Sequence, residues 1–177
     1  MTAEPPRRHV VSALVIDRPG TLNRVAGLFR ARSFNIESLT VGTTLEPGRS
    51  RMTIVIHADE RHLHQVLAQL ERLIEVIEVT DLTDAPRVEL ELALVELDEP
   101  LDPAGLAAVT AVVERSGGVV ISAGHGAWRL RLAAPPDEIE GALDTLRSHG
   151  LRNLVRAGSV AMATGTPLPP HIGASTP

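Results

Sequence analysis

The chain has 177 residues, a net charge of −5 and an aromatic content of only 2%. Cys, Lys and Tyr are absent, so all 17 basic residues are arginines. These absences exclude a disulfide, a thiolate nucleophile or metal ligand, a Schiff-base lysine and a P-loop lysine. An acidic chain with so few aromatic rings also lacks the basic field and the stacking surfaces with which proteins bind nucleic acids.

The sequence predicts no membrane segment. No apolar run approaches the ~20 residues that a bilayer-spanning helix needs. The prolines and arginines of residues 5–8 are not followed by an apolar region with a cleavage site, as a secretory signal would be. We therefore expect a cytoplasmic protein that binds neither a membrane nor nucleic acid, with a core of Leu, Val, Ile and Ala.

The first half of the chain alternates strand-like and helix-like apolar patterns. β-Branched and alternating apolar segments predict strands at residues 10–16, 35–41, 51–57 and 74–82. Apolar residues that recur at i, i+3, i+4 and i+7 predict helices over residues 22–29 and 63–70. Proline and glycine mark the turns between these segments. The predicted order is βαββαβ.

After a short linker at residues 84–86, the same order repeats about 80 residues further along the chain. Strands are predicted at residues 88–94, 119–123, 128–132 and 151–162, and helices over 103–113 and 139–146. A βαββαβ unit forms a four-stranded antiparallel sheet with both helices on one face, the ferredoxin-like motif. The predicted fold class is therefore α+β, with two ferredoxin-like βαββαβ domains in tandem.

The domain boundaries follow from these patterns. We place the first domain at residues 9–84 and the second at residues 86–163. A disordered N-terminus at residues 1–8 and a disordered, proline-rich tail at residues 164–177 flank them. A unit of this size buries only about 60–65% of its surface and is marginal alone. Because each unit also leaves one sheet face bare, we expect at least a homodimer.

The sequence offers no catalytic residue and no metal site. His62 and His64 are the only close histidine pair, but side chains at i and i+2 of a helix point to different sides and do not share a metal ion. The other polar candidates are scattered, at His57, His125, His149 and in an acidic loop of Asp98, Glu99 and Asp102. We interpret that loop as a helix start with Asp102 as the N-cap; a carboxylate pair for acid–base chemistry is the alternative.

The most informative segment is Asp17-Arg18-Pro19-Gly20-Thr21-Leu22, which ends a strand, turns and begins a helix. Gly20 allows another group to approach the backbone closely. The free N–H groups at such a helix start favour an anion, for example a carboxylate, and Asp17 could accept from an ammonium group. Asn35, at the start of the second strand, either caps a turn or reaches a ligand across a dimer interface.

Here the sequence resembles a known family. Asp17–Leu22 looks like the ligand loop of ACT domains, the βαββαβ modules that sense amino acids. The run Phe34-Asn35-Ile36-Glu37-Ser38-Leu39-Thr40-Val41-Gly42 closely resembles the small regulatory subunit of acetolactate synthase. Residues 50–55 and 69–77 resemble it too. The resemblance implies an N-terminal ACT domain followed by an ACT-like C-terminal domain.

The resemblance also implies regulation rather than catalysis. Members of this family dimerise through their ACT domains and bind a large catalytic subunit that depends on thiamine diphosphate. They activate that subunit and mediate its feedback inhibition by valine, in some cases by leucine or isoleucine, in branched-chain amino acid biosynthesis. Thiamine diphosphate, Mg and FAD are then expected in the catalytic partner and none in this chain. By position, the effector-binding residues are Asp17, Gly20, Thr21 and Leu22 of one protomer with Asn35 and Ile36 of its neighbour.

The second half departs from the family pattern, since Glu96 stands toward the end of a strand where the family usually has a lysine. This departure leaves an alternative open, namely a stand-alone ACT-domain amino-acid sensor that regulates a different partner. An enzyme on a ferredoxin-like scaffold is the third alternative.

Overall fold

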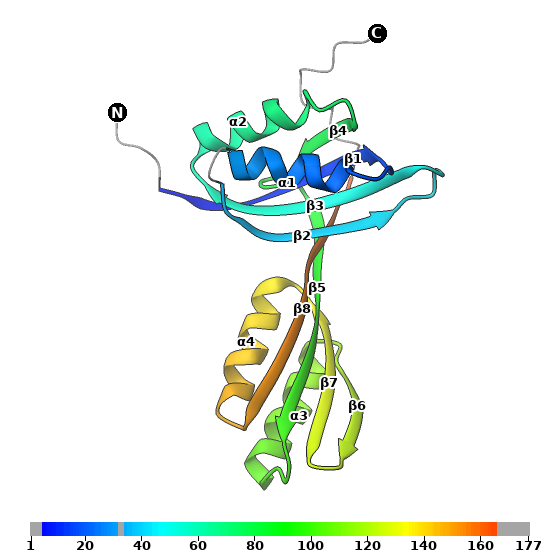
Figure 1. The fold of residues 1–177 in the computed structure, drawn as a ribbon. Helices are drawn as coiled ribbons and strands as arrows, with labels where there is room; N and C mark the ends of the chain where they lie inside the picture. The colour runs from blue at the N-terminus through cyan, green and yellow to red at the C-terminus, as the bar shows by residue number, and fades with distance from the viewer. Residues whose placement is uncertain (1–4, 32–33, 166–177) are drawn as a thin grey trace. The chain divides into compact units, whose positions relative to one another are not determined.

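The computed structural model describes residues 5–31 and 34–165. They form two compact units (Figure 1). The first contains the described residues up to Val88 together with those from Val160 onward, and the second is Glu89–Ser159. No helix among the described residues is long and apolar enough to cross a membrane.

The first unit has the predicted order of elements, β1, α1, β2, β3, α2 and β4. Their bounds are Arg7–Ile16, Thr21–Ala31, Ile36–Thr43, Arg49–Ala58, Glu60–Leu70 and Val76–Asp81. The strands form one antiparallel sheet in the order β2-β3-β1-β4. Both helices lie on the same face of this sheet (Figure 1).

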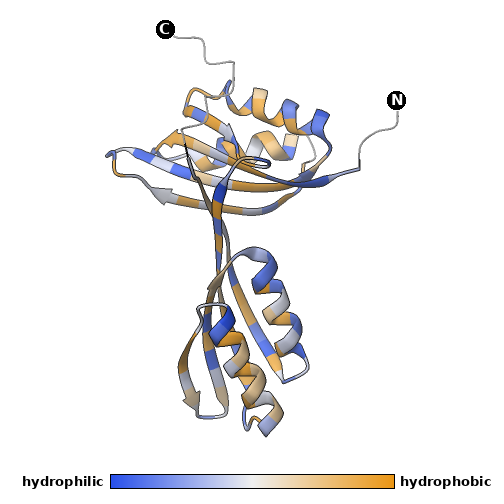
Figure 2. Ribbon diagram, turned by 180° about the vertical axis from the view of Figure 1, so that it is seen from behind, coloured by the Kyte–Doolittle hydropathy of each residue, from blue (hydrophilic) through white to orange (hydrophobic). Residues whose placement is uncertain are grey.

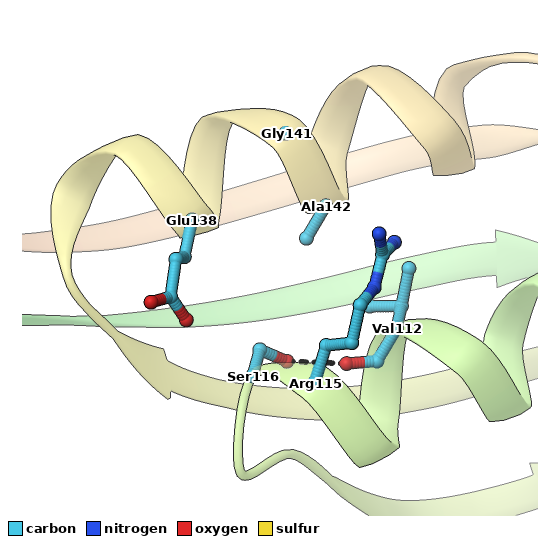
Figure 3. A pocket seen from close by; sticks show the side chains of 6 residues that line it. All are labelled: Val112, Arg115, Ser116, Glu138, Gly141 and Ala142. Carbon is cyan, nitrogen blue, oxygen red and sulfur yellow. Dashed lines mark hydrogen bonds between the residues drawn. The ribbon is translucent and has the colours of Figure 1, made fainter.

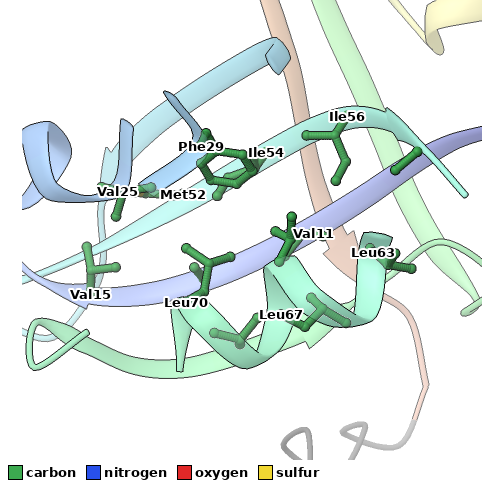
Figure 4. Close-up of a cluster of buried hydrophobic side chains, with 14 residues drawn as sticks. Val11, Val15, Val25, Phe29, Met52, Ile54, Ile56, Leu63, Leu67 and Leu70 are labelled. Carbon is green, nitrogen blue, oxygen red and sulfur yellow. The ribbon is translucent and has the colours of Figure 1, made fainter. Parts of the chain in front are cut away.

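The core of the first unit lies between the helices and the sheet (Figure 4). Alternate residues of β1, namely Val11, Ala13 and Val15, face the helices and are almost fully buried. They meet Phe29 of α1 and Leu67 of α2, which belong to the helical apolar stripes. The intervening residues of β1 point to the opposite face of the sheet, because side chains alternate along a strand.

The second unit repeats the arrangement with β5, α3, β6, β7, α4 and β8. Their bounds are Arg87–Asp98, Pro103–Arg115, Val119–Gly124, Ala127–Ala134, Pro136–Arg147 and Leu151–Ala163. The sheet order is β6-β7-β5-β8. Hydrophobic and hydrophilic residues alternate along these strands (Figure 2), so one face packs on α3 and α4. On the other face, Leu90, Leu92 and Leu94 remain about 40% exposed.

These findings confirm the α+β fold with two βαββαβ units. Strand β1 begins at Arg7, so residues 7 and 8, predicted to be disordered, pair with the end of β3. The end of β8 groups with the first unit, where the Ala161 N–H donates to the Thr53 hydroxyl at 3.3 Å. Of the predicted tail only residues 164 and 165 are described, and the Thr164 N–H donates to the Pro86 carbonyl at 2.8 Å. The rest of the tail and residues 1–4 lie outside the described residues.

Candidate functional site

The loop between β1 and α1 is held at both of its ends. The Asp17 N–H donates to the Gly48 carbonyl at 2.8 Å, and the Thr21 hydroxyl donates to the Ile16 carbonyl at 3.0 Å. Gly20 has a φ of +93°, a conformation that glycine adopts without the steric cost of a Cβ. The turn therefore ends β1 sharply and fixes where α1 begins.

The first turn of α1 leaves backbone donors available to a ligand. The Thr21 N–H bonds the Arg18 carbonyl at 3.2 Å. In the part of the chain that the structure describes, the N–H groups of Leu22 and Asn23 have no acceptor, and no acidic residue stands in this turn. The positive end of the helix dipole is thus uncompensated and favours an anion. Nothing lies within 4 Å of a Cβ built at Gly20, so the approach to these groups is open.

The structure places the predicted site residues in two groups. Asp17, Gly20 and Leu22 are exposed around the start of α1, whereas Thr21 is only 4% exposed, because its hydroxyl ties α1 to β1. Asn35 is exposed, and Ile36 is half-buried against the core at the start of β2. The 11 residues of α1, about 16 Å of helix, separate the two groups within one chain.

Arg24 and Glu75 adjoin the loop and were not predicted from the sequence. The Arg24 Nε lies 3.2 Å from Glu75 Oε1, and the Glu75 carbonyl accepts from the Ile16 N–H at 2.8 Å. The other carboxylate oxygen of Glu75 is buried and has no hydrogen-bond partner among the described residues. No spacing rule joins these residues, because the contact arises only when β4 pairs with β1.

Two of the candidate histidines, His62 and His57, are engaged in local contacts. The Nδ1 of His62 lies 2.8 Å from the carboxylate of Asp59, the N-cap of α2, and His57 pairs with Glu37 at 2.6 Å. No group of three or more His, Asp or Glu side chains that could hold a metal ion occurs within residues 5–31 and 34–165. The predicted N-cap at Asp102 is confirmed, since its carboxylate accepts from the Gly105 N–H at 2.7 Å.

A hollow of about 370 Å³ lies between α3 and α4 of the second unit (Figure 3). Its lining includes the apolar side chain of Val112 from α3 and the small side chain of Ala142 from α4. Arg115 and Glu138 extend into the space between the two helices from opposite sides (Figure 3). The buried Ser116 hydroxyl donates to the Val112 carbonyl at 2.6 Å and so serves the end of α3.

Glu96 forms part of an ionic cluster on the sheet of the second unit. Its carboxylate lies 2.7 Å from Arg129 and 2.7 Å from Arg152. The hydrogen bond from Arg152 holds the pKa of Glu96 below its usual range, and the charge of Arg129 adds to the effect. The negative charge of Glu96 is therefore matched by arginines on the two neighbouring strands, β7 and β8.

The chain matches two family models, one for each half. Residues 11–78 match the AHAS small subunit-like ACT domain, and residues 90–165 match the small subunit of acetolactate synthase. The loop at residues 17–20, α1 and the start of β2 all lie within the first match.

Relatives and a solved structure extend this similarity over most of the chain. A probable acetolactate synthase small subunit of Archaeoglobus fulgidus is 39% identical and covers 89% of this chain and 98% of its own. The acetolactate synthase small subunit of Aquifex aeolicus is 36% identical, covering 88% and 81%. The crystal structure of the Thermotoga maritima small subunit is 32% identical and superimposes with a TM-score of 0.79, over 90% of this chain and 99% of that one. The chain belongs to the acetolactate synthase small subunit family and carries its ACT domain.

Proposed function

We propose that this chain is the regulatory subunit of an acetolactate synthase. It binds the large, thiamine-diphosphate-dependent catalytic subunit, raises its activity and makes it sensitive to valine. The observation that carries the valine response is the start of α1, where two backbone N–H groups and an open Gly20 offer a carboxylate site. The exposed Asp17 carboxylate at the same loop supplies a partner for the ammonium group.

The sheet topology supports a homodimer that completes this site. Strand β2 is an edge strand, with β3 as its one neighbour in the described sheet. Thr43, at the end of β2, pairs with Ser50, and Ile16 pairs with Arg49, so the end of β2 and the 17–20 loop share one end of the sheet. If a second copy pairs antiparallel along β2, its own strand begins at that same end.

This pairing brings the two groups of site residues together. The partner's Asn35 and the partner's Ile36 then lie at the end of the sheet that carries the 17–20 loop of the first protomer. The amide reaches the ligand, and the apolar residue adds an aliphatic wall. A ligand that contacts both protomers is sensitive to how they are arranged, which is what an allosteric effector requires.

In this proposal the catalytic site of the acetolactate synthase lies in the large subunit. Thiamine diphosphate, Mg and FAD reside in the catalytic subunit, and this chain supplies no cofactor site. The match of the second half to the acetolactate synthase small subunit favours this partner over a stand-alone sensor of some other protein.

The test is an assay of acetolactate formation by the cognate catalytic subunit. Adding this chain should raise the rate, and valine should then lower it in a saturable manner; leucine and isoleucine are assayed in parallel to identify the effector. The catalytic subunit alone, with the same valine additions, is the control. Absence of both stimulation and inhibition would refute the proposal.

A further inference from the structure

The face of the first sheet opposite α1 and α2 carries a cavity of about 400 Å³ that the 17–20 loop does not touch. Strands β1, β3 and β4 form its floor, and residues 161–163 at the end of β8 form one wall. All of these segments belong to the first compact unit. The cavity is therefore part of this unit and separate from the start of α1.

Two opposite charges stand at the two sides of this cavity. Arg51 of β3 and Glu78 of β4 both pair with Leu14 of the central strand, so the three residues form one row across the sheet. The charged residues are thus two strand spacings, about 10 Å, apart at the backbone. Leu14, 9% exposed, occupies the position between them. Over residues 5–31 and 34–165, neither charge has an ion-pair partner.

Each charged group is instead oriented by a hydroxyl in the floor. Arg51 Nη1 donates to the Ser12 Oγ at 3.0 Å, and the Thr80 hydroxyl donates to Glu78 Oε1 at 3.0 Å. Ser12 and Thr80 pair with one another in the next row of the sheet and are 3% and 8% exposed. Buried hydroxyls therefore fix the two charged heads without neutralising them.

The remaining side of the cavity is apolar and ordered. Leu82 is 2% exposed and packs with Val10, Val55 and Ala161. The Ala161 N–H bond to the Thr53 hydroxyl holds this wall against the sheet. The cavity thus combines a guanidinium, a carboxylate and an aliphatic surface.

We propose that this cavity is a second ligand site, which binds a small zwitterion such as a free amino acid. The ligand's carboxylate lies against Arg51, which can bind it with two parallel hydrogen bonds. Its cationic nitrogen lies near Glu78, and its aliphatic part faces Leu82. Such a ligand supplies a counter-charge to each of the two groups, which have none within residues 5–31 and 34–165.

The test measures binding by calorimetry to the full chain, with the twenty L-amino acids as probes. It uses a Gly20→Asp background, in which binding at the start of α1 is expected to be weakened. At least one amino acid should bind, with one site per chain, and Arg51→Gln should weaken that binding at least about tenfold. Arg49→Gln, on the same strand but outside the cavity, is the matched control and should leave the affinity unchanged.

Charge-deleted probes identify the orientation. The N-acetyl derivative of the bound amino acid, which lacks the positive charge, should bind more weakly than the parent and should lose no further affinity in Glu78→Gln. Binding that Arg51→Gln leaves unchanged overturns the proposal, and so does the absence of any binding tighter than about 10 mM. Neither outcome bears on inhibition through the 17–20 loop, because that is measured separately with the catalytic subunit.

Discussion

Replacing Gly20 with aspartate adds a negative charge beside the backbone N–H groups that begin α1. If an effector carboxylate lies at this helix end, the new side chain competes with it for the same donors and repels it. We expect Gly20→Asp to abolish or strongly weaken inhibition by valine while the fold persists.

The local structure at Gly20 allows both the loss of stability and the loss of effector affinity to be estimated. Gly20 has a φ of +93°, so any residue with a Cβ incurs a backbone cost of about 1–2 kcal/mol there. No steric cost is added, because nothing lies within 4 Å of the new Cβ. For a chain of this size the melting temperature then falls by about 2–8 °C. Two carboxylates about 4 Å apart repel by about 1 kcal/mol in bulk water and by about 4 kcal/mol near a protein surface. The lower value already weakens binding about fivefold.

The assay compares Gly20→Asp with Gly20→Ala in the acetolactate assay with the catalytic subunit. Both variants bear a similar backbone cost, but only one adds a charge. The valine concentration for half inhibition should rise at least about fivefold in Gly20→Asp and at most about twofold in Gly20→Ala. Normal inhibition of Gly20→Asp, or equal shifts in the two variants, would show that the carboxylate does not bind at this helix end.

Three further outcomes are expected. Glu91 is 5% exposed and accepts two hydrogen bonds from Arg156, at 2.6 and 2.8 Å. Glu91→Ala should therefore lower the unfolding free energy, measured by denaturant titration, by about 2 kcal/mol. Glu140→Ala, which removes a more exposed partner of the same arginine, is the control and should lower it by about 0.5 kcal/mol. The folded-state pKa of Glu96 is lowered, so its contribution to stability is present above its unfolded pKa of about 4.3 and is lost as the pH falls through the lower, folded-state value. The difference in melting temperature between wild type and Glu96→Gln should therefore shrink as the pH is lowered from 7 to below the unfolded pKa. Dilution of the chain below its dimer dissociation constant should weaken valine binding, and an affinity that is independent of chain concentration would contradict a shared site.

Much of the fold was predictable from local pattern. The apolar stripe of α2 and the alternation along β5 each follow from the periodicity of one element buried on one side. Strand β1 was predicted to start too late, because Arg7 and Arg8 carry no apolar signal. They extend the strand by pairing with β3 and by an ion pair from Arg7 to Glu60 at 2.5 Å, contacts that the sequence pattern does not contain.

The last residues of β8 belong to the first compact unit, although the sequence predicted them to be part of the second domain. Residues 151–163 form one strand, and an unbroken strand pattern gives no sign that it passes from one compact unit to the other. The change is made by tertiary contacts, chiefly those of Ala161 with Val10, Val55 and Leu82. The cavity on the open sheet face was missed for the same reason, since its wall comes from a segment more than 70 residues away from its floor in sequence.

The residues at the start of α1 show which parts of the candidate site can be predicted from the sequence. The sequence indicated a carboxylate site at residues 17–22, and the available N–H groups of Leu22 and Asn23 give this a geometric basis. It also suggested Thr21 as a contact, but that hydroxyl is buried and bonded to Ile16, so it serves the loop more than a ligand. These donors were predictable as a group, because the first N–H groups of any helix lack an acceptor within the helix, whatever the residues are.

The position of Asn35 determines where the proposed effector would bind. Because α1 keeps Asn35 and the 17–20 loop at opposite ends, a ligand held by both must lie between two chains in the proposed dimer. Its binding free energy then includes part of the dimer interface, and by linkage it strengthens the dimer by the same factor by which the dimer strengthens its binding. In the proposed function, a ligand of a few atoms can in this way change the arrangement of two subunits and, through them, the activity of the catalytic partner.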